Sequence, residues 1–224
     1  VGFVSLDQVK QSMQGDMVKI LELPRVEESA AMVERAFRQF RAQQTIHGGK
    51  VTRKDKQELR TRLAKLDDEL DRYMAGEYGI RVDKQKDLDG WKASHQPFHW
   101  FVEFYGIMHA GGFDVIIGNP PYVEVKSRGP YAVRDYKSLS ARDLYAYILE
   151  RALNLSSHGT RLGFIVPLSC FNVERFSSLQ DEYFRANDAL WISSWSGDAH
   201  PARLFEGVDK RLQIVITRKQ EDKD

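Results

Sequence analysis

The chain has 224 residues, of which 42% are hydrophobic, and this is enough for one sizeable core or two small ones. Its 33 Lys and Arg residues nearly balance 32 Asp and Glu residues, which excludes a polybasic nucleic-acid arm but not a local basic face. The single cysteine, Cys170, excludes an internal disulfide and a thiolate-rich metal site.

The first part of the chain is predicted to be helical. Residues 1–25 are a leader of unclear structure, and 26–75 predict a charged helical hairpin. Apolar residues fall on one face of each helix, at the spacing of helices packed side by side. These residues are Met32, Val33, Ala36, Phe37 and Phe40, then Leu59, Leu63, Leu66, Leu70 and Tyr73. The basic residues of the second helix could meet phosphates, but a solvated face threaded with Asp and Glu is the favoured interpretation.

The next segment is polar, and residues 76–96 predict a connector. Three histidines follow in or near an aromatic stretch, His95, His99 and His109. Their spacing matches no zinc motif, so we expect packing or surface histidines and no metal. No long uncharged apolar segment and no basic-then-apolar start is present, so we expect a cytoplasmic protein without a membrane partner.

Residues 97–220 alternate between strands and helices in the α/β manner, and 221–224 are a polar tail. The predicted strands are 113–117, 161–167, 189–195 and 211–218. The first is a short continuous apolar run, typical of a strand covered on both faces. One helix is predicted to begin near Ser140, with Ser140 as cap and Asp143 three residues later, and to stop near Gly159. A second contains Phe176, Leu179 and Tyr183, and Trp191 and Trp195 are expected to pack.

The sequence GGFDVIIGNPPYVEV, residues 111–125, ends a predicted strand in a rigid turn. Gly118 permits tight backbone geometry, while Pro120 and Pro121 restrict φ and remove two N–H donors. Asn119 adds an amide acceptor, and Tyr122 adds a flat face for stacking. Two acceptors can bind the two hydrogens of a conjugated amine and aim its lone pair at an electrophile. Such a site would act by positioning and electrostatics.

The motif NPPY after an apolar strand resembles that of the amino methyltransferases that use S-adenosylmethionine. The wider pattern is similar to the gamma-type DNA adenine-N6 methyltransferases found in single-chain restriction–modification enzymes. The similarity runs from PFHWFVEFYGIMHAGGFDVIIGNPPYVEV through DLYAYILERAL and GTRLGFIVP to RLFEGVDKRLQIVIT. The resemblance implies an α/β fold, the C-terminal half of a Rossmann-like methyltransferase sheet, preceded by the charged helical hairpin.

The resemblance also implies roles for individual residues. The Asn119 side chain and the Pro120 carbonyl would accept hydrogen bonds from adenine N6, and Tyr122 would stack on the base after it flips out of the duplex. The residues implied to line the base pocket are Pro121, Asp143, Leu144, Tyr145 and Phe205. Asp143 could equally be a plain capping residue, and Phe205 could equally plug the core.

One family feature is missing from the sequence. The family binds its methyl donor with a glycine-rich loop followed by an acidic residue, and neither is found. In the gamma order that loop precedes NPPY, so we expect it before residue 1, and a target-recognition domain after residue 224. The isolated chain is then expected to be inactive. Its strand at 113–117 would lack a neighbour, which favours self-association or covering by the N-terminal region.

Three functions fit these observations. The first is part of a DNA adenine methyltransferase acting on double-stranded DNA, in a restriction–modification or phage-defence system of a bacterium or archaeon. The second is a protein-glutamine methyltransferase, which also uses NPPY because an amide nitrogen is equally unreactive. The third is a fragment that folds, and touches DNA, without catalysing a reaction.

Overall fold

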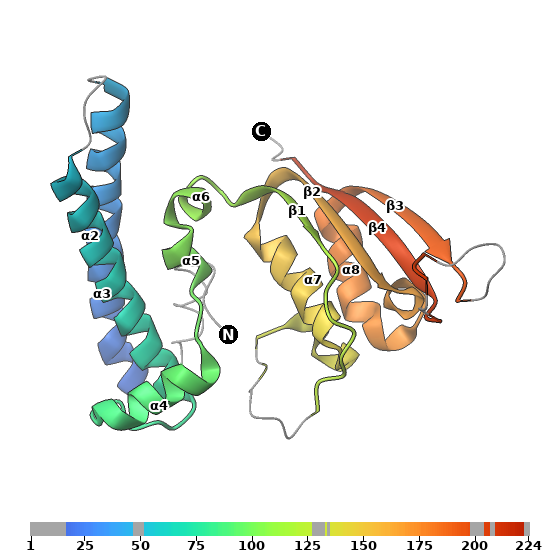
Figure 1. Cartoon of the computed structure of the whole chain (residues 1–224), viewed down its shortest axis with the longest axis horizontal. Helices are drawn as coiled ribbons and strands as arrows, with labels where there is room; N and C mark the ends of the chain where they lie inside the picture. The colour runs from blue at the N-terminus through green and yellow to red at the C-terminus, as the bar shows by residue number, and fades with distance from the viewer. Residues whose placement is uncertain are drawn as a thin grey trace. The chain divides into compact units, whose positions relative to one another are not determined.

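The structure is a computed structural model that describes residues 17–46, 52–126, 133, 135–197, 204–206 and 209–221. The chain divides into two compact units, Val1–His109 and Ala110–Asp224 (Figure 1). Over the described residues, none of the helices combines the length and apolar character that a membrane crossing requires.

The first unit is helical. Its helices are α2 (Met17–Ile46), α3 (Arg53–Glu77), α4 (Gln85–His95), α5 (Trp100–Glu103) and α6 (Tyr105–His109). The predicted hairpin is present as α2 and α3, whose buried apolar residues belong to one cluster with Val33, Leu66 and Leu70 fully buried. Thr52 caps α3 in a capping box with Asp55, which satisfies backbone N–H groups at the start of the helix. The long charged helices are therefore held by a narrow apolar seam.

The segment predicted as a connector contains helix α4. Its residues Leu88 and Trp91 are buried in the same core cluster, while the polar residues around them face solvent. Val102 and Tyr105 also belong to this cluster, so residues 97–109 are part of the helical unit. Two apolar residues three positions apart are enough to anchor a helix, and the polar composition of 76–96 concealed them.

Asp71 and His99 form the centre of a buried polar cluster in the helical unit. His99 Nε2 lies 2.9 Å from Asp71 Oδ1, and the Lys92 ammonium lies 2.8 Å from Asp71 Oδ2 and 2.9 Å from Asp68 Oδ1. Burial raises the pKa of the neighbouring Asp67, and the charge of Asp71 raises it further. Within the described residues, the ligand atoms of Asp67, Asp71 and His99 lie within 4.8 Å of one another, close enough to share a cation. Lys92 supplies positive charge there, and the network joins α3 to α4 and to the residue preceding α5.

The second unit is a four-stranded sheet with helices, which confirms the α/β class. Its strands are β1 (Phe113–Gly118), β2 (Ser156–Pro167), β3 (Asn187–Trp195) and β4 (Leu212–Lys219), in the order β1-β2-β4-β3. β1 pairs parallel with β2, whereas β4 is antiparallel to both β2 and β3. Its helical segments are η1 (Lys137–Ala141), α7 (Leu144–Leu155), η2 (Leu168–Phe171), η3 (Glu174–Phe176) and α8 (Ser177–Ala186). Helices α7 and α8 lie together against the sheet (Figure 1).

The core of this unit lies between the sheet and helices α7 and α8. Alternate residues of β2 and β4 face these helices, among them Phe164 and Val215, and they meet Leu149 and Tyr183. Cys170 is buried in the same cluster and free, and burial raises the pKa of its thiol. Burial alternates along β2 and β4 because successive side chains of a strand point to opposite faces, and the helices cover only one of these faces.

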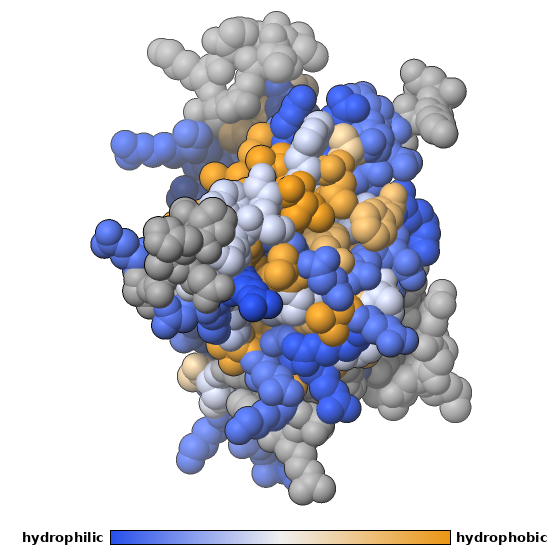
Figure 2. Space-filling view, turned by 90° about the vertical axis from the view of Figure 1, so that its right-hand side faces the viewer, coloured by the Kyte–Doolittle hydropathy of each residue, from blue (hydrophilic) through white to orange (hydrophobic). Residues whose placement is uncertain are grey.

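The opposite face of the sheet is uncovered within the described unit. On β1, Val115 is 60% and Ile117 is 79% exposed, which differs from the expected burial on both faces. The strand register places Ile117 beside Gly163, Gly163 beside Ile216, and Ile216 beside Trp191, so an apolar row crosses all four strands. Trp191 is therefore exposed, whereas it was expected to pack. Figure 2 shows hydrophobic side chains gathered on the face of the molecule turned toward the viewer. Because β1 pairs only with β2, it is an edge strand of the described sheet.

Helix α7 begins later than its sequence pattern predicts. Asp143 occupies the N-cap position without a side-chain capping bond, and Ser140 lies in the short helix η1 instead. The Ser140 hydroxyl donates to the Arg175 carbonyl, and the Asp143 carboxylate pairs with the Arg175 side chain. Tertiary contacts with residue 175 therefore replace the local capping box.

Candidate active site

The candidate site lies where β1 and β2 end. Parallel neighbours bring their carboxyl ends to the same edge of a sheet, so the turn after Gly118 lies near the segment after Pro167. The segment after the turn is tied to the start of α7 by two backbone bonds: the Leu144 N–H donates to the Val123 carbonyl at 2.9 Å, and the Val125 N–H donates to the Arg142 carbonyl at 2.7 Å. Residues from three separate elements are thereby held together.

Tyr122 is bonded through its hydroxyl. The hydroxyl oxygen lies 2.7 Å from Asn119 Oδ1 and 3.0 Å from the Ile165 carbonyl oxygen, and both partners are acceptors. One hydroxyl hydrogen is shared between them, and together they link the turn to the end of β2. Burial raises the pKa of Tyr122, which keeps this hydroxyl protonated at neutral pH. The sequence pattern indicated a use for the ring alone and gave no signal for this hydroxyl contact.

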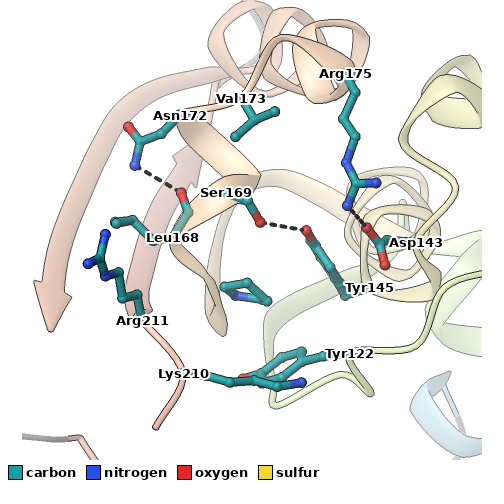
Figure 3. Close-up of a pocket in the computed structure, with 11 residues that line it drawn as sticks. Tyr122, Asp143, Tyr145, Leu168, Ser169, Asn172, Val173, Arg175, Lys210 and Arg211 are labelled. Carbon is teal, nitrogen blue, oxygen red and sulfur yellow. Dashed lines mark hydrogen bonds and ion pairs between the residues drawn. The ribbon is translucent and has the colours of Figure 1, made fainter. Parts of the chain in front are cut away.

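The Tyr122 ring is held from two sides. The ring of Tyr145 meets it edge to face, with centroids 6.1 Å apart and an interplanar angle of 89°. The Lys210 ammonium lies 5.4 Å from the Tyr122 ring centroid, and Figure 3 shows the lysine side chain alongside the tyrosine. Burial strongly raises the pKa of Tyr145, whose hydroxyl lies 3.3 Å from Ser169 Oγ. The ring of Tyr122 is thus fixed as one wall of a concave site.

A cavity of about 530 Å³ opens beside this ring (Figure 3). Its walls come from the NPPY turn, the start of α7, the segment after β2 and the segment before β4. The lining residues are Tyr122, Asp143, Tyr145, Pro167, Leu168, Ser169, Asn172, Val173, Arg175, Lys210 and Arg211. The mixture of aromatic and aliphatic walls with a few polar groups suits a flat heterocycle that must be held in one orientation.

Asp143 is occupied by an ion pair. Its carboxylate Oδ2 lies 2.5 Å from an Arg175 nitrogen, and the guanidinium also lies 4.8 Å from the Phe176 ring centroid. Burial raises the pKa of Asp143, and Arg175 opposes that rise. The pair closes one side of the cavity and fixes the beginning of α7 against the segment after β2.

The predicted site residues do not all reach the cavity. Tyr122, Asp143 and Tyr145 line the cavity. Asn119 is exposed and does not line it, but its side chain accepts a hydrogen bond from the Tyr122 hydroxyl and so lies next to a lining residue. Phe205 is 40% exposed and does not line the cavity.

The two prolines of the turn differ in exposure. Pro120 is buried and Pro121 is exposed. Neither lines the cavity. The buried ring of Pro120 therefore anchors the turn, and the Pro120 carbonyl follows directly after Asn119 in the chain.

Several lining residues were not anticipated from the sequence. Ser169, Asn172 and Arg175 follow the second predicted strand, and their position after Pro167 was a usable signal, because parallel strands end at one edge. Lys210 and Arg211 precede β4, and they reach the site because β4 runs antiparallel to β2. The sequence contains no signal for that direction.

Residues 25–196 match the protein family described as Eco57I restriction-modification methylase. This range covers most of the chain. The chain belongs to this family. Both the NPPY turn and the segments that form most of the cavity wall lie inside the matched range, so the site is built largely from residues that the family match includes.

Two curated relatives match part of the chain. A Methanocaldococcus jannaschii protein named as a putative type II restriction enzyme and methyltransferase is 35% identical over 89 residues, 40% of this chain and 8% of its own length. A type II methyltransferase of Thermus thermophilus is 28% identical over 113 residues, 45% of this chain and 26% of its own length. The chain therefore spans less than a tenth of the first relative and about a quarter of the second.

Solved structures show more distant likeness. A nuclease-deletion mutant of the type ISP restriction-modification enzyme LlaGI, in complex with a DNA substrate mimic, has a TM-score of 0.42 and 19% identity over 55% of this chain and 15% of that chain. A Listeria monocytogenes protein described as a putative class I S-adenosylmethionine-dependent methyltransferase has a TM-score of 0.35 and 15% identity over 51% of this chain and 34% of that chain.

Proposed function

We propose that this chain holds the target base in a DNA methyltransferase that transfers a methyl group from S-adenosylmethionine to adenine N6. The observation that carries the proposal is the joined pair of Asn119 and Tyr122, placed at a strand end beside a cavity of about 530 Å³. Membership of a restriction-modification methylase family favours DNA over a peptide as the acceptor. The adenine assignment rests on the resemblance of the NPPY pattern to the adenine-N6 enzymes.

The proposed chemistry is positioning of a weak nucleophile. The adenine N6 hydrogens are donated to Asn119 Oδ1 and to the Pro120 carbonyl, which moves the N6 lone pair out of conjugation with the ring. Tyr122 stacks on the base and keeps N6 at the two acceptors. Because these acceptors act before any proton leaves, no strong general base is needed for attack.

The cavity fits the acceptor base better than the methyl donor. S-adenosylmethionine supplies an electrophilic methyl group when it is bound. Among the described lining residues, Asp143 is the one carboxylate, and Arg175 already pairs with it, so no carboxylate is available there to grip a ribose. We therefore assign the residues of this cavity to the base, and the donor to residues outside the cavity.

The proposal requires the base to leave the duplex, because adenine N6 is out of reach within stacked DNA. The partner is therefore double-stranded DNA with one nucleotide flipped into the cavity, in the cytoplasm of a bacterial or archaeal cell. The Asp143–Arg175 pair would bound the side of the pocket away from Tyr122.

A competition between acceptors tests the class of substrate. The complete protein, given donor with an isotopically labelled methyl group, is offered equal concentrations of mixed-sequence duplex DNA and a glutamine-containing peptide. We expect the label in the DNA, because the family match and the cavity favour a base. Label in the peptide alone would reject the proposal in favour of a protein-glutamine methyltransferase.

Substitutions at Tyr122 separate the ring from its hydroxyl. Tyr122→Phe keeps the stacking face and removes the bonds to Asn119 and Ile165, so we expect methylation about two- to tenfold slower, the value of one net hydrogen bond. Tyr122→Ala also removes base stacking, worth about 1–3 kcal/mol, and should bind an extruded base poorly. A fluorescent adenine analogue at the target position measures extrusion.

The matched control is Tyr145→Phe. It also removes a tyrosine hydroxyl from the cavity, but this hydroxyl contacts Ser169 and not Asn119. It should leave the methylation rate closer to the unmodified protein than Tyr122→Phe does. Equal base extrusion by the Ala and Phe variants of Tyr122 would make that residue a structural one only.

A further inference from the structure

We propose that Lys210 and Arg211 bind the backbone phosphates that flank the flipped nucleotide. This inference rests on the proposed function and extends it from the base to the rest of the nucleotide. It starts from the observation that the cavity has a two-residue basic rim, defined as Lys210 and Arg211, on the side formed by the segment before β4.

The backbone of the basic rim is fixed by the sheet. The Leu168 N–H donates to the Arg211 carbonyl at 3.0 Å, and the next residue, Leu212, pairs with Pro167 in the antiparallel ladder. Both basic side chains are exposed, and Figure 3 shows Lys210 extending along Tyr122 and Arg211 extending beside Leu168. The rim and the base-binding turn are both bonded to the end of β2, the rim through Leu168 and the turn through the Ile165 carbonyl, so the sheet holds them near each other.

The positive charge at the cavity exceeds what the one carboxylate among its described lining residues can neutralise, since Lys210 as well as Arg175 acts on Asp143 and lowers its pKa against the rise caused by burial. Arg175, the third cation of the cavity, is paired with Asp143, so these two contribute no net charge together. Within the part of the chain that the structure describes, neither Lys210 nor Arg211 has a carboxylate partner within ion-pair distance. A concave site whose described lining includes three cations and one carboxylate has a net positive charge, which attracts an anionic ligand.

The arrangement of charge and aromatic surface fits a nucleotide. The Lys210 ammonium lies over the Tyr122 ring, 5.4 Å from its centroid, so the cationic rim contacts the same ring that is proposed to stack on the base. A nucleotide has the same sequence of groups, a flat base joined through a sugar to a phosphate. A glutamine side chain carries no anionic group of its own, so the basic rim suits a nucleotide better than a glutamine. Arg and Lys contacts to phosphates are the usual means of fixing a DNA-binding protein in register.

The test is the salt dependence of binding to duplex DNA by the complete protein. Lys210→Gln and Arg211→Gln each remove one cation. For every phosphate that a variant no longer neutralises, the slope of log affinity against log salt should become shallower by about 0.9. Arg161→Gln is the matched control, because Arg161 is an exposed cation on the uncovered face of the sheet, away from the cavity. Its slope should stay close to that of the unmodified protein.

A second measurement locates the contact on the DNA. Duplexes with a neutral methylphosphonate at the phosphates next to the target nucleotide should weaken binding by the unmodified protein, and should weaken binding by the Lys210→Gln, Arg211→Gln double variant much less. Lys210→Arg retains the charge and should restore the slope. An identical slope for the rim variants and the Arg161→Gln control, with DNA still methylated, would overturn this inference alone. Failure of the protein to methylate DNA at all would overturn the proposed function instead.

Discussion

The complete protein carrying Asn119→Ala is expected to methylate DNA about 10²–10³-fold more slowly in a single turnover, because removal of one preorganised contact to the reacting group costs about that much. Asn119 offers the side-chain acceptor of the turn, and its oxygen is held 2.7 Å from the Tyr122 hydroxyl. Rapid-quench measurement with enzyme in excess over DNA reports the chemical step directly.

DNA affinity supplies the control for this variant. Because Asn119 is exposed at the turn and lies outside the basic rim, DNA binding measured by fluorescence anisotropy should change little. Near-normal single-turnover methylation by Asn119→Ala would remove this residue from the reaction. A parallel loss of binding and rate would instead show that the substitution damages the fold of the turn.

Gly112→Ala is expected to destabilise the sheet unit by about 2–5 kcal/mol, the sum of a left-handed backbone cost and a forced overlap. Gly112 has φ +118°, and a Cβ there would overlap the Leu155 carbonyl oxygen and lie 2.9 Å from the Ser156 carbonyl carbon. This close approach sets the start of β1 against the junction between α7 and β2. Urea unfolding measures the loss in the free energy of unfolding, and hydrogen exchange at the amides of β1 and β2 locates it.

The neighbouring glycine separates the two causes. Gly111 has φ +106°, but a Cβ there would meet only the Ser157 Cβ, at 3.8 Å. Gly111→Ala should therefore cost only the left-handed backbone penalty, about 1–2 kcal/mol. Equal losses for the two variants would contradict the steric account, and the pair Gly111-Gly112 would then be a matter of backbone conformation alone.

The strands were predictable because their signals are local. The runs that begin at Phe113, Arg161, Ala189 and Arg211 each contain enough apolar or β-branched residues to be recognised without any partner. The turn at Asn119 was equally readable, since proline restricts the backbone whatever surrounds it. These two levels were sufficient to place the candidate base-binding turn at the end of a strand.

Contacts between distant segments could not be read in this way. The Asp143 pattern predicted a local cap, whereas its carboxylate is used by Arg175, 32 residues later. The basic rim at Lys210 reaches the cavity only because β4 inserts antiparallel between β2 and β3, a strand order that apolar patterning does not encode. Likewise, the apolar run of β1 predicts a strand with both faces buried, but it contains no information on whether another segment covers Ile117, which is exposed.

The most direct test of the central claim is the identity of the methylated atom. The complete protein is incubated with duplex DNA and donor carrying an isotopically labelled methyl group, the DNA is digested to nucleosides, and the products are resolved by mass spectrometry. The account predicts labelled N6-methyladenine from the unmodified protein, formed about 10²–10³-fold more slowly by Asn119→Ala. Label on cytosine alone, or N6-methyladenine formed equally fast by both proteins, would contradict it.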